Sequence, residues 1–92
     1  DKMKRIKNVE TLDDFVLRVT FKDDQSFDVN LSELIRKSKR FKRFEEHPEE
    51  FQEVSVVASG IGIEWESGLD YSSESLWKLA ELQSPLEAQY FV

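Results

Sequence analysis

Residues 15–22 show the clearest periodicity in the chain, an alternation of apolar and polar positions. Every odd position from Phe15 to Phe21 is apolar, whereas the even positions include Arg18 and Lys22. A period of two predicts a β-strand with one buried face and one solvated face. This arrangement is typical of antiparallel sheets.

The flanking segments extend this strand into a sheet. A polar turn at residues 23–25 leads into residues 26–30, where apolar positions alternate again, so we predict a β-hairpin. Upstream, residues 4–10 predict another strand. Val9 breaks the alternation that begins at Ile6, which indicates an edge strand or a β-bulge.

A second hairpin is predicted from residues 53–57 and 61–65, joined by a turn. Ile61, Ile63 and Trp65 would lie on one face of its second strand. We take the stretch from residue 61 onward as the organising element of the fold because it holds both tryptophans. Both are expected in the core, in one arrangement touching each other across the junction between strand and helix.

The last helix follows a turn at Ser67-Gly68, where Gly68 is expected at positive φ, and a short extended segment. Ser72 or Ser73 is the expected N-cap, and the helix is expected to end before Pro85. The face expected to pack on the sheet consists of Leu76, Leu79 and Ala80, with Trp77 at its edge.

Two shorter helices are predicted in the middle of the chain. Asn30 and Glu33 have the spacing of a capping box, with Ser32 as the competing cap. Pro48 suits the first position of the second helix, where its missing N–H costs nothing. The aromatic residues expected to anchor this region to the core are Phe41, Phe44 and Phe51.

These elements predict a small α+β fold with a mainly antiparallel sheet of four or five strands and two or three short helices. Ninety-two residues form a single domain with one modest core. We assign residues 1–82 to this domain and residues 83–92 to a C-terminal tail. Its apolar end, residues 90–92, is expected to dock on the domain or on a partner.

Charge is distributed unevenly along the chain. The net charge is −6, but residues 1–43 carry +4 and residues 44–92 carry −10. Six cations occupy eight positions: Arg36, Lys37, Lys39, Arg40, Lys42 and Arg43. Such a run binds nucleic acid or an acidic protein partner, or it is simply a solvated face. We favour an acidic protein, since glutamates follow at once and the adjacent phenylalanines are expected to be buried.

Several chemistries find little support. The chain has no cysteine and one histidine, so we expect no disulfide, no metal, no cofactor and no nucleophile–base pair. The three glycines do not form a phosphate-binding loop. Adjacent carboxylates, such as Asp13 and Asp14, are expected to be solvated turn residues. No apolar run reaches the roughly 18 residues of a membrane helix, so we expect a cytoplasmic protein.

The alternation at 15–21 followed by Ile63-Glu-Trp65-x-x-Gly68-Leu69-Asp70 resembles the bacterial domain of unknown function 2442 family. The resemblance covers about residues 4–82 and is most specific at Trp65, Gly68, Leu69 and Asp70. It implies a small α+β fold with no established catalytic activity. Some family members resemble antitoxins encoded beside a second small protein. Some longer members carry a helix-turn-helix domain after this one, and we expect none here because ten residues after Leu82 are too few.

We therefore predict a non-catalytic protein-binding or regulatory domain, the antitoxin-like half of a two-protein system. A small protein is the expected partner, and a homo-oligomer is an alternative. The second hypothesis is a nucleic-acid-associated regulator that uses residues 36–43, and the third is a small enzyme. The motif residues Trp65, Gly68, Leu69 and Asp70 are expected to be structural, with Asp70 bonding N–H groups of the turn.

Overall fold

The computed structural model describes residues 3–84 and shows an α+β fold. In chain order, its elements are β1 (Ile6–Thr11), β2 (Val16–Phe21), β3 (Ser26–Asn30), α1 (Ser32–Lys37), α2 (Arg43–Glu46), the 3₁₀ helix η1 (Pro48–Gln52), β4 (Val54–Val56), the 3₁₀ helix η2 (Ala58–Gly60), β5 (Gly62–Trp65), β6 (Asp70–Ser72) and α3 (Ser73–Gln83).

The strands form two antiparallel sheets of three strands, ordered β1-β2-β3 and β4-β5-β6. The prediction of one sheet with four or five strands is therefore wrong in its count and its partition. The extra strand is β6, whose three residues are too few for a periodic pattern. The α+β class is confirmed.

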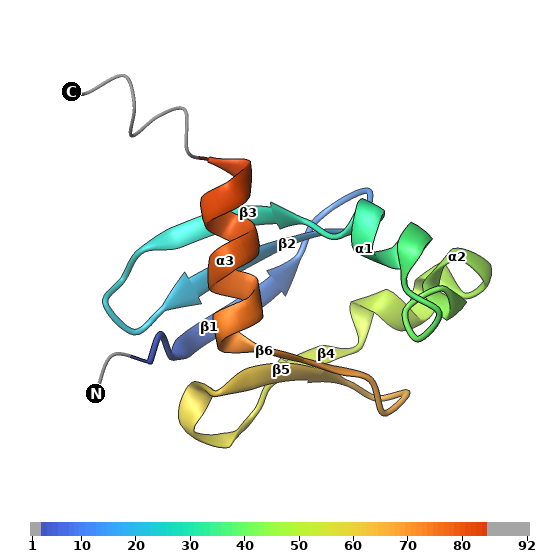
Figure 1. Cartoon of the computed structure of the whole chain (residues 1–92). Helices are drawn as coiled ribbons and strands as arrows, with labels where there is room; N and C mark the ends of the chain where they lie inside the picture. The colour runs from blue at the N-terminus through green and yellow to red at the C-terminus, as the bar shows by residue number, and fades with distance from the viewer. Residues whose placement is uncertain (1–2, 85–92) are drawn as a thin grey trace.

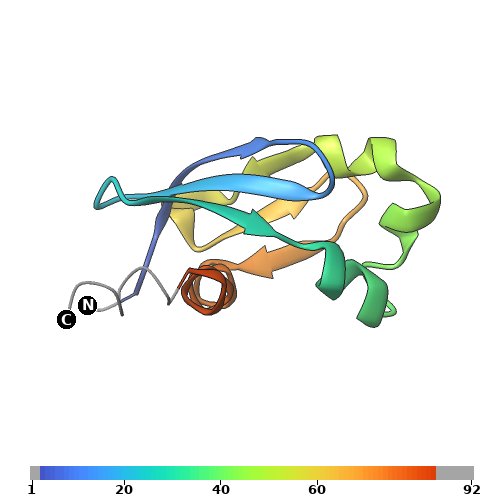
Figure 2. The same ribbon diagram turned by 90° about the horizontal axis from the view of Figure 1, so that it is seen from above.

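The long helix α3 contacts both sheets, through β3 of the first and through β5 and β6 of the second. Figure 1 shows α3 in orange, running from β6 past β1, β2 and β3. Figure 2 shows that α1, α2 and η1 gather at one end of the molecule. Strands β1 and β4 are neighbours across the junction of the two sheets, which lets one core run through both.

The first hairpin follows the predicted alternation. Leu17 lies opposite Val29 and Val19 lies opposite Phe27, and Leu17, Val19 and Val29 are fully buried. The predicted irregularity of the first strand is also confirmed, because the pairing of β1 with β2 shifts register between Ile6 and Asn8. A bulge at this point restores Ile6 to the core despite the broken alternation.

The two tryptophans lie in separate aromatic clusters. Trp65 is 2% exposed and packs against Phe41, Phe44 and Phe51, with ring centroids 5.2–5.9 Å apart. Trp77 is half-buried and meets other rings, at 5.2 Å from Phe21 and 5.4 Å from Phe27. The alternative that places the two indoles in contact is therefore wrong.

Two further local predictions need correction. Ile61 is 47% exposed, since it lies in a bend before β5 rather than on the buried face with Ile63. Helix α1 has no side-chain cap on its N-cap residue, and the Asn30 carboxamide instead accepts a bond from the Ser32 N–H at 2.8 Å. Glu33 pairs with cations of its own helix and not with the Asn30 backbone.

Helix α3 begins as predicted. The Ser72 hydroxyl accepts a hydrogen bond from the Ser75 N–H at 3.1 Å, and Leu76 and Ala80 are buried. Gln83, which we assign to the tail, is the last residue of the helix. The predicted docking of residues 90–92 falls outside the described residues.

The turn between β1 and β2 is strained. Asp14 and Phe15 both adopt positive φ, at 59° and 62°. Our prediction placed Phe15 in the strand, but β2 begins one residue later. The Phe15 ring packs edge-to-face on Phe51 at 5.2 Å, and this contact holds a bulky residue in a conformation that costs about 1–2 kcal/mol.

Replacing Asp14 with glycine is expected to stabilise the protein by about 0.5–1 kcal/mol. Glycine removes the left-handed penalty of about 1–2 kcal/mol, and the greater entropy of the unfolded chain offsets part of the gain. The Asp14 side chain forms no ion pair or hydrogen bond within residues 3–84, so little else is lost. Urea unfolding measures the change.

Asp13→Gly is the matched control, because Asp13 is equally exposed but is not among the residues at positive φ. This variant is expected to lose stability slightly. Equal effects of the two substitutions would show that Asp14 stores no strain.

Candidate protein-binding surface

The basic segment, residues 36–43, spans the last turn of α1, the connecting turn and the start of α2. Two phenylalanines attach this segment to the hydrophobic core: Phe41 is 2% exposed, and Phe44, which follows the segment, is fully buried. Phe41 packs edge-to-face on Trp65 and Tyr71, so the segment is held against the second sheet. The predicted burial of both phenylalanines is confirmed.

The two cations of α1 share one carboxylate within the helix. Arg36 and Lys37 lie 3.3 and 3.4 Å from the same Glu33 carboxylate oxygen, at i,i+3 and i,i+4 spacing. All three side chains are largely exposed, so each pair contributes only a few tenths of a kcal/mol. One carboxylate offsets only one of these two positive charges, so the field that they present to a partner is weakened but not removed.

Two other cations of the segment reach across the fold. Arg43 forms a two-pronged bond with Glu50 of η1, at 2.7 and 2.9 Å. This bond raises the pKa of Arg43 and lowers the pKa of Glu50. Arg40 lies 3.5 Å from an Asp70 carboxylate oxygen and stacks over the Phe41 ring. These arginines therefore connect the segment to η1 and β6.

Lys39 and Lys42 differ from the other four cations. Both are exposed residues of the turn between α1 and α2, and neither has an ion-pair partner in the described part of the chain. They are the two cations of the basic segment without a carboxylate partner in the described residues. Sequence reasoning did not separate them, although the spacing of Glu33 from Arg36 and Lys37 is a readable signal of local pairing.

The family motif forms the turn between β5 and β6. Trp65 donates its backbone N–H to Leu69 and accepts from the Gly68 N–H, at 2.8 and 2.9 Å. Gly68 has a φ of 102°, as predicted. The prediction that Asp70 bonds N–H groups of this turn is wrong for the described residues, because its carboxylate pairs with Arg40 instead.

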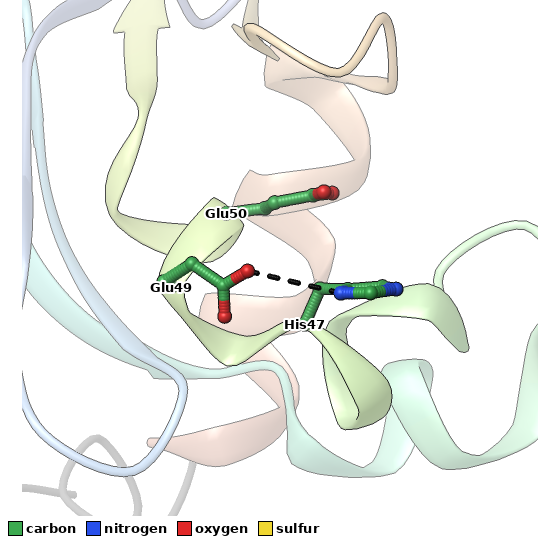
Figure 3. A group of neighbouring side chains, drawn as sticks. All are labelled: His47, Glu49 and Glu50. Atoms are coloured by element: carbon green, nitrogen blue, oxygen red, sulfur yellow. Dashed lines mark ion pairs between the residues drawn. The ribbon is translucent and has the colours of Figure 1, made fainter.

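His47, Glu49 and Glu50 form the one group of potential metal ligands found within residues 3–84 (Figure 3). Their ligand atoms lie within 4.8 Å of one another, and His47 Nδ1 is 3.7 Å from Glu49. Tetrahedral ligands at about 2.0–2.1 Å from zinc must approach more closely than this. Both Glu50 oxygens already accept from Arg43, whose positive charge opposes a cation, so the group is not a built metal site.

The sequence was compared with family models, curated proteins and solved structures. No helix in the described part of the chain is long and apolar enough to cross a membrane. Neither the curated proteins nor the solved structures contain a significant match to the sequence. A family model described as "Protein of unknown function (DUF2442)" matches residues 6–81, from the first strand through nearly all of α3. The chain therefore belongs to the DUF2442 family.

Proposed function

We propose that this domain is a non-catalytic protein-binding module of the cytoplasm, the antitoxin-like or regulatory half of a bacterial two-protein system. Lys39 and Lys42 contact an acidic surface of a small protein partner. The observation that supports this role is their position: two uncompensated lysines on a turn held rigid by the buried Phe41 and Phe44. A rigid turn loses little conformational entropy on binding.

The same geometry favours protein over nucleic acid. Single-stranded nucleic acid is held by cations together with aromatic rings on which bases stack. Phe41 and Phe44 are buried and offer no such ring at the surface. Arg40 and Arg43 each pair with a carboxylate, and the two cations of α1 share a third, so three of the six positive charges are offset. A surface with so few free cations gives weak phosphate binding at physiological salt.

The proposal that the domain is not an enzyme rests on its chemistry. His47 is exposed, and within residues 3–84 its one ion pair is with Glu49, at 3.7 Å. General acid–base or nucleophilic catalysis requires a reacting group positioned beside its base in a site that excludes water. His47 has no such setting in the described part of the chain, and a binding role needs none.

The double variant Lys39→Glu/Lys42→Glu is expected to recover at least about tenfold less of the partner than the wild type does. Its free energy of unfolding should stay within about 0.5 kcal/mol of the wild-type value. Neither lysine forms an ion pair in the described residues, so reversal breaks no ion pair there. The measurement is a tagged pull-down from nuclease-treated lysate of the source cells, quantified by mass spectrometry.

Reversal of Arg40 and Arg43 is expected to weaken binding as well, at a stability cost below about 1 kcal/mol.

The matched control is Lys22→Glu/Lys78→Glu, which makes the same change in net charge at two exposed lysines outside the basic segment. It should retain the partner. Equal retention by both double variants would remove the basic segment from the interface. Binding of a labelled single-stranded oligonucleotide that falls steeply between 50 and 200 mM salt, and is lost in Lys39→Glu/Lys42→Glu, would instead favour the nucleic-acid regulator.

A further inference from the structure

The outer edge of β3 already holds a group that imitates a peptide. The Gln83 side-chain amide accepts from the Asn30 N–H at 2.8 Å and donates to the Asn30 C=O, also at 2.8 Å. A neighbouring residue of an antiparallel strand would make the same pair of bonds. Gln83 therefore takes the place of one residue of a fourth strand beside β3, the edge of the first sheet (Figure 1).

The rest of this edge is open. The Gln25 C=O and the Leu31 N–H, which flank β3, both bond toward β2. The direction of the backbone N–H and C=O groups alternates along an antiparallel strand. Those of Phe27 and Val29 therefore face β2, whereas those of Ser26, Asp28 and Asn30 face outward. Gln83 satisfies Asn30. The outward N–H and C=O groups of Ser26 and Asp28 have no strand beside them within the described residues.

A groove runs along this open edge. It has a volume of about 430 Å³, and its walls come from both β3 and the end of α3. Arg18 and Asp28 form one rim and bond to each other in two places, at 2.8 and 3.2 Å. The opposite wall includes Ser84 and the buried Ala80, whose small side chains leave room for the backbone of another chain.

We propose that the β3 edge and this groove bind an extended segment of a partner protein, which adds a strand to the first sheet. Main-chain hydrogen bonds to Ser26 and Asp28 would supply affinity, and alternate side chains would face Ala80 on one side and the Arg18–Asp28 pair on the other. The segment that fits therefore alternates small apolar residues with polar ones. This inference is independent of the proposed role of Lys39 and Lys42.

A second copy of the chain fits this edge less well. Pairing of two β3 strands about Asp28 needs Asn30, which Gln83 already occupies, and pairing about Phe27 uses only Ser26 and Asp28. Two free residues bury far less than the roughly 1,200 Å² of a stable dimer interface. A single extended segment avoids both costs, because it can also contact α3 along the groove.

Two synthetic hexapeptides test the proposal: one with the sequence of β2, Val16–Phe21, which already pairs with β3 on its other side, and one that alternates threonine and valine. Each is titrated into the full-length, ¹⁵N-labelled protein. We expect saturable amide shifts, with slowed hydrogen exchange at Ser26 and Asp28. If neither peptide perturbs these amides at millimolar concentration, the proposal fails.

Backbone N-methylation of the peptides provides a matched control that leaves the protein unchanged. Methyl groups on the residues that bond to β3 should weaken binding at least about tenfold, whereas methyl groups on the alternate residues should not. Equal effects would overturn strand addition. Lys39→Glu/Lys42→Glu should bind the peptides like the wild type, so failure here is distinguishable from failure of the basic segment.

Gln83→Ala tests whether the carboxamide occupies a strand position. Its removal frees both Asn30 groups, so the peptides should bind a few-fold more tightly and the Asn30 amide should join the protected set. No change at Asn30 would contradict this role. Slow hydrogen exchange at Ser26 and Asp28 before peptide is added would also overturn the proposal. In a monomeric protein, this result would favour residues 85–92 as the segment that binds the edge. Protection that rises with protein concentration would favour a second copy of the chain.

Discussion

Replacing Trp65 with alanine is expected to destabilise the domain by about 3–5 kcal/mol, the usual cost of removing a buried aromatic ring. Trp65 touches three phenylalanines, and its indole N–H donates to the Phe51 C=O at 3.0 Å. Alanine leaves a cavity among these rings and an unpaired carbonyl. A domain of this size has a total stability of about 5–14 kcal/mol, so the variant loses a large part of it.

Urea unfolding followed by far-ultraviolet circular dichroism measures this loss without relying on tryptophan emission. Trp65→Phe keeps most of the ring and removes the N–H donor, so it should cost less than alanine, about 1–2 kcal/mol. Trp77→Ala is the control for a half-buried indole in the other aromatic cluster and should also cost less. A loss at Trp65 no larger than the loss at Trp77 would show that the Trp65 cluster is not the better packed of the two.

Local patterns account for what could be predicted of this fold. The hairpin of β2 and β3, the bulge in β1 and the Ser72 cap each depend on residues close together in sequence, and all three are confirmed. Period two and capping chemistry act within a few residues, and therefore one sequence is enough to find them. The division into two sheets depends on distant contacts between β1 and β4, which no local pattern encodes.

The surface shows the same limit. The sequence shows the six cations, but it does not show which of them are paired with a carboxylate in the folded chain. Arg40 pairs with Asp70, thirty positions later, and Arg43 pairs with Glu50. The contact between Gln83 and Asn30 spans 53 positions. Strain at Phe15 was equally invisible, since a phenylalanine at positive φ contradicts its own preference and persists only through tertiary packing.

Gly60 is the glycine at which a methyl group should do most damage. A Cβ at this position would lie 2.4 Å from the Ile6 carbonyl oxygen and 2.9 Å from the Ile6 nitrogen, closer than real Cβ atoms come. Both atoms belong to the backbone of β1 and cannot rotate away. The residue also has a φ of +75°, which disfavours any side chain. The close approach of η2 to β1 therefore requires glycine.

Gly60→Ala is expected to cost about 3–4 kcal/mol, the sum of backbone strain of about 1–3 kcal/mol and displacement of β1. Gly68→Ala separates the two contributions, because Gly68 also has positive φ but no atom within 4 Å of its Cβ position. This control should lose only the strain. Urea unfolding gives both free energies, and the Ile6 amide resonance should move in Gly60→Ala alone. If the two variants were equally stable, contact with β1 would not be the reason that Gly60 is glycine, and the junction between the two sheets would tolerate a wider spacing than the structure shows.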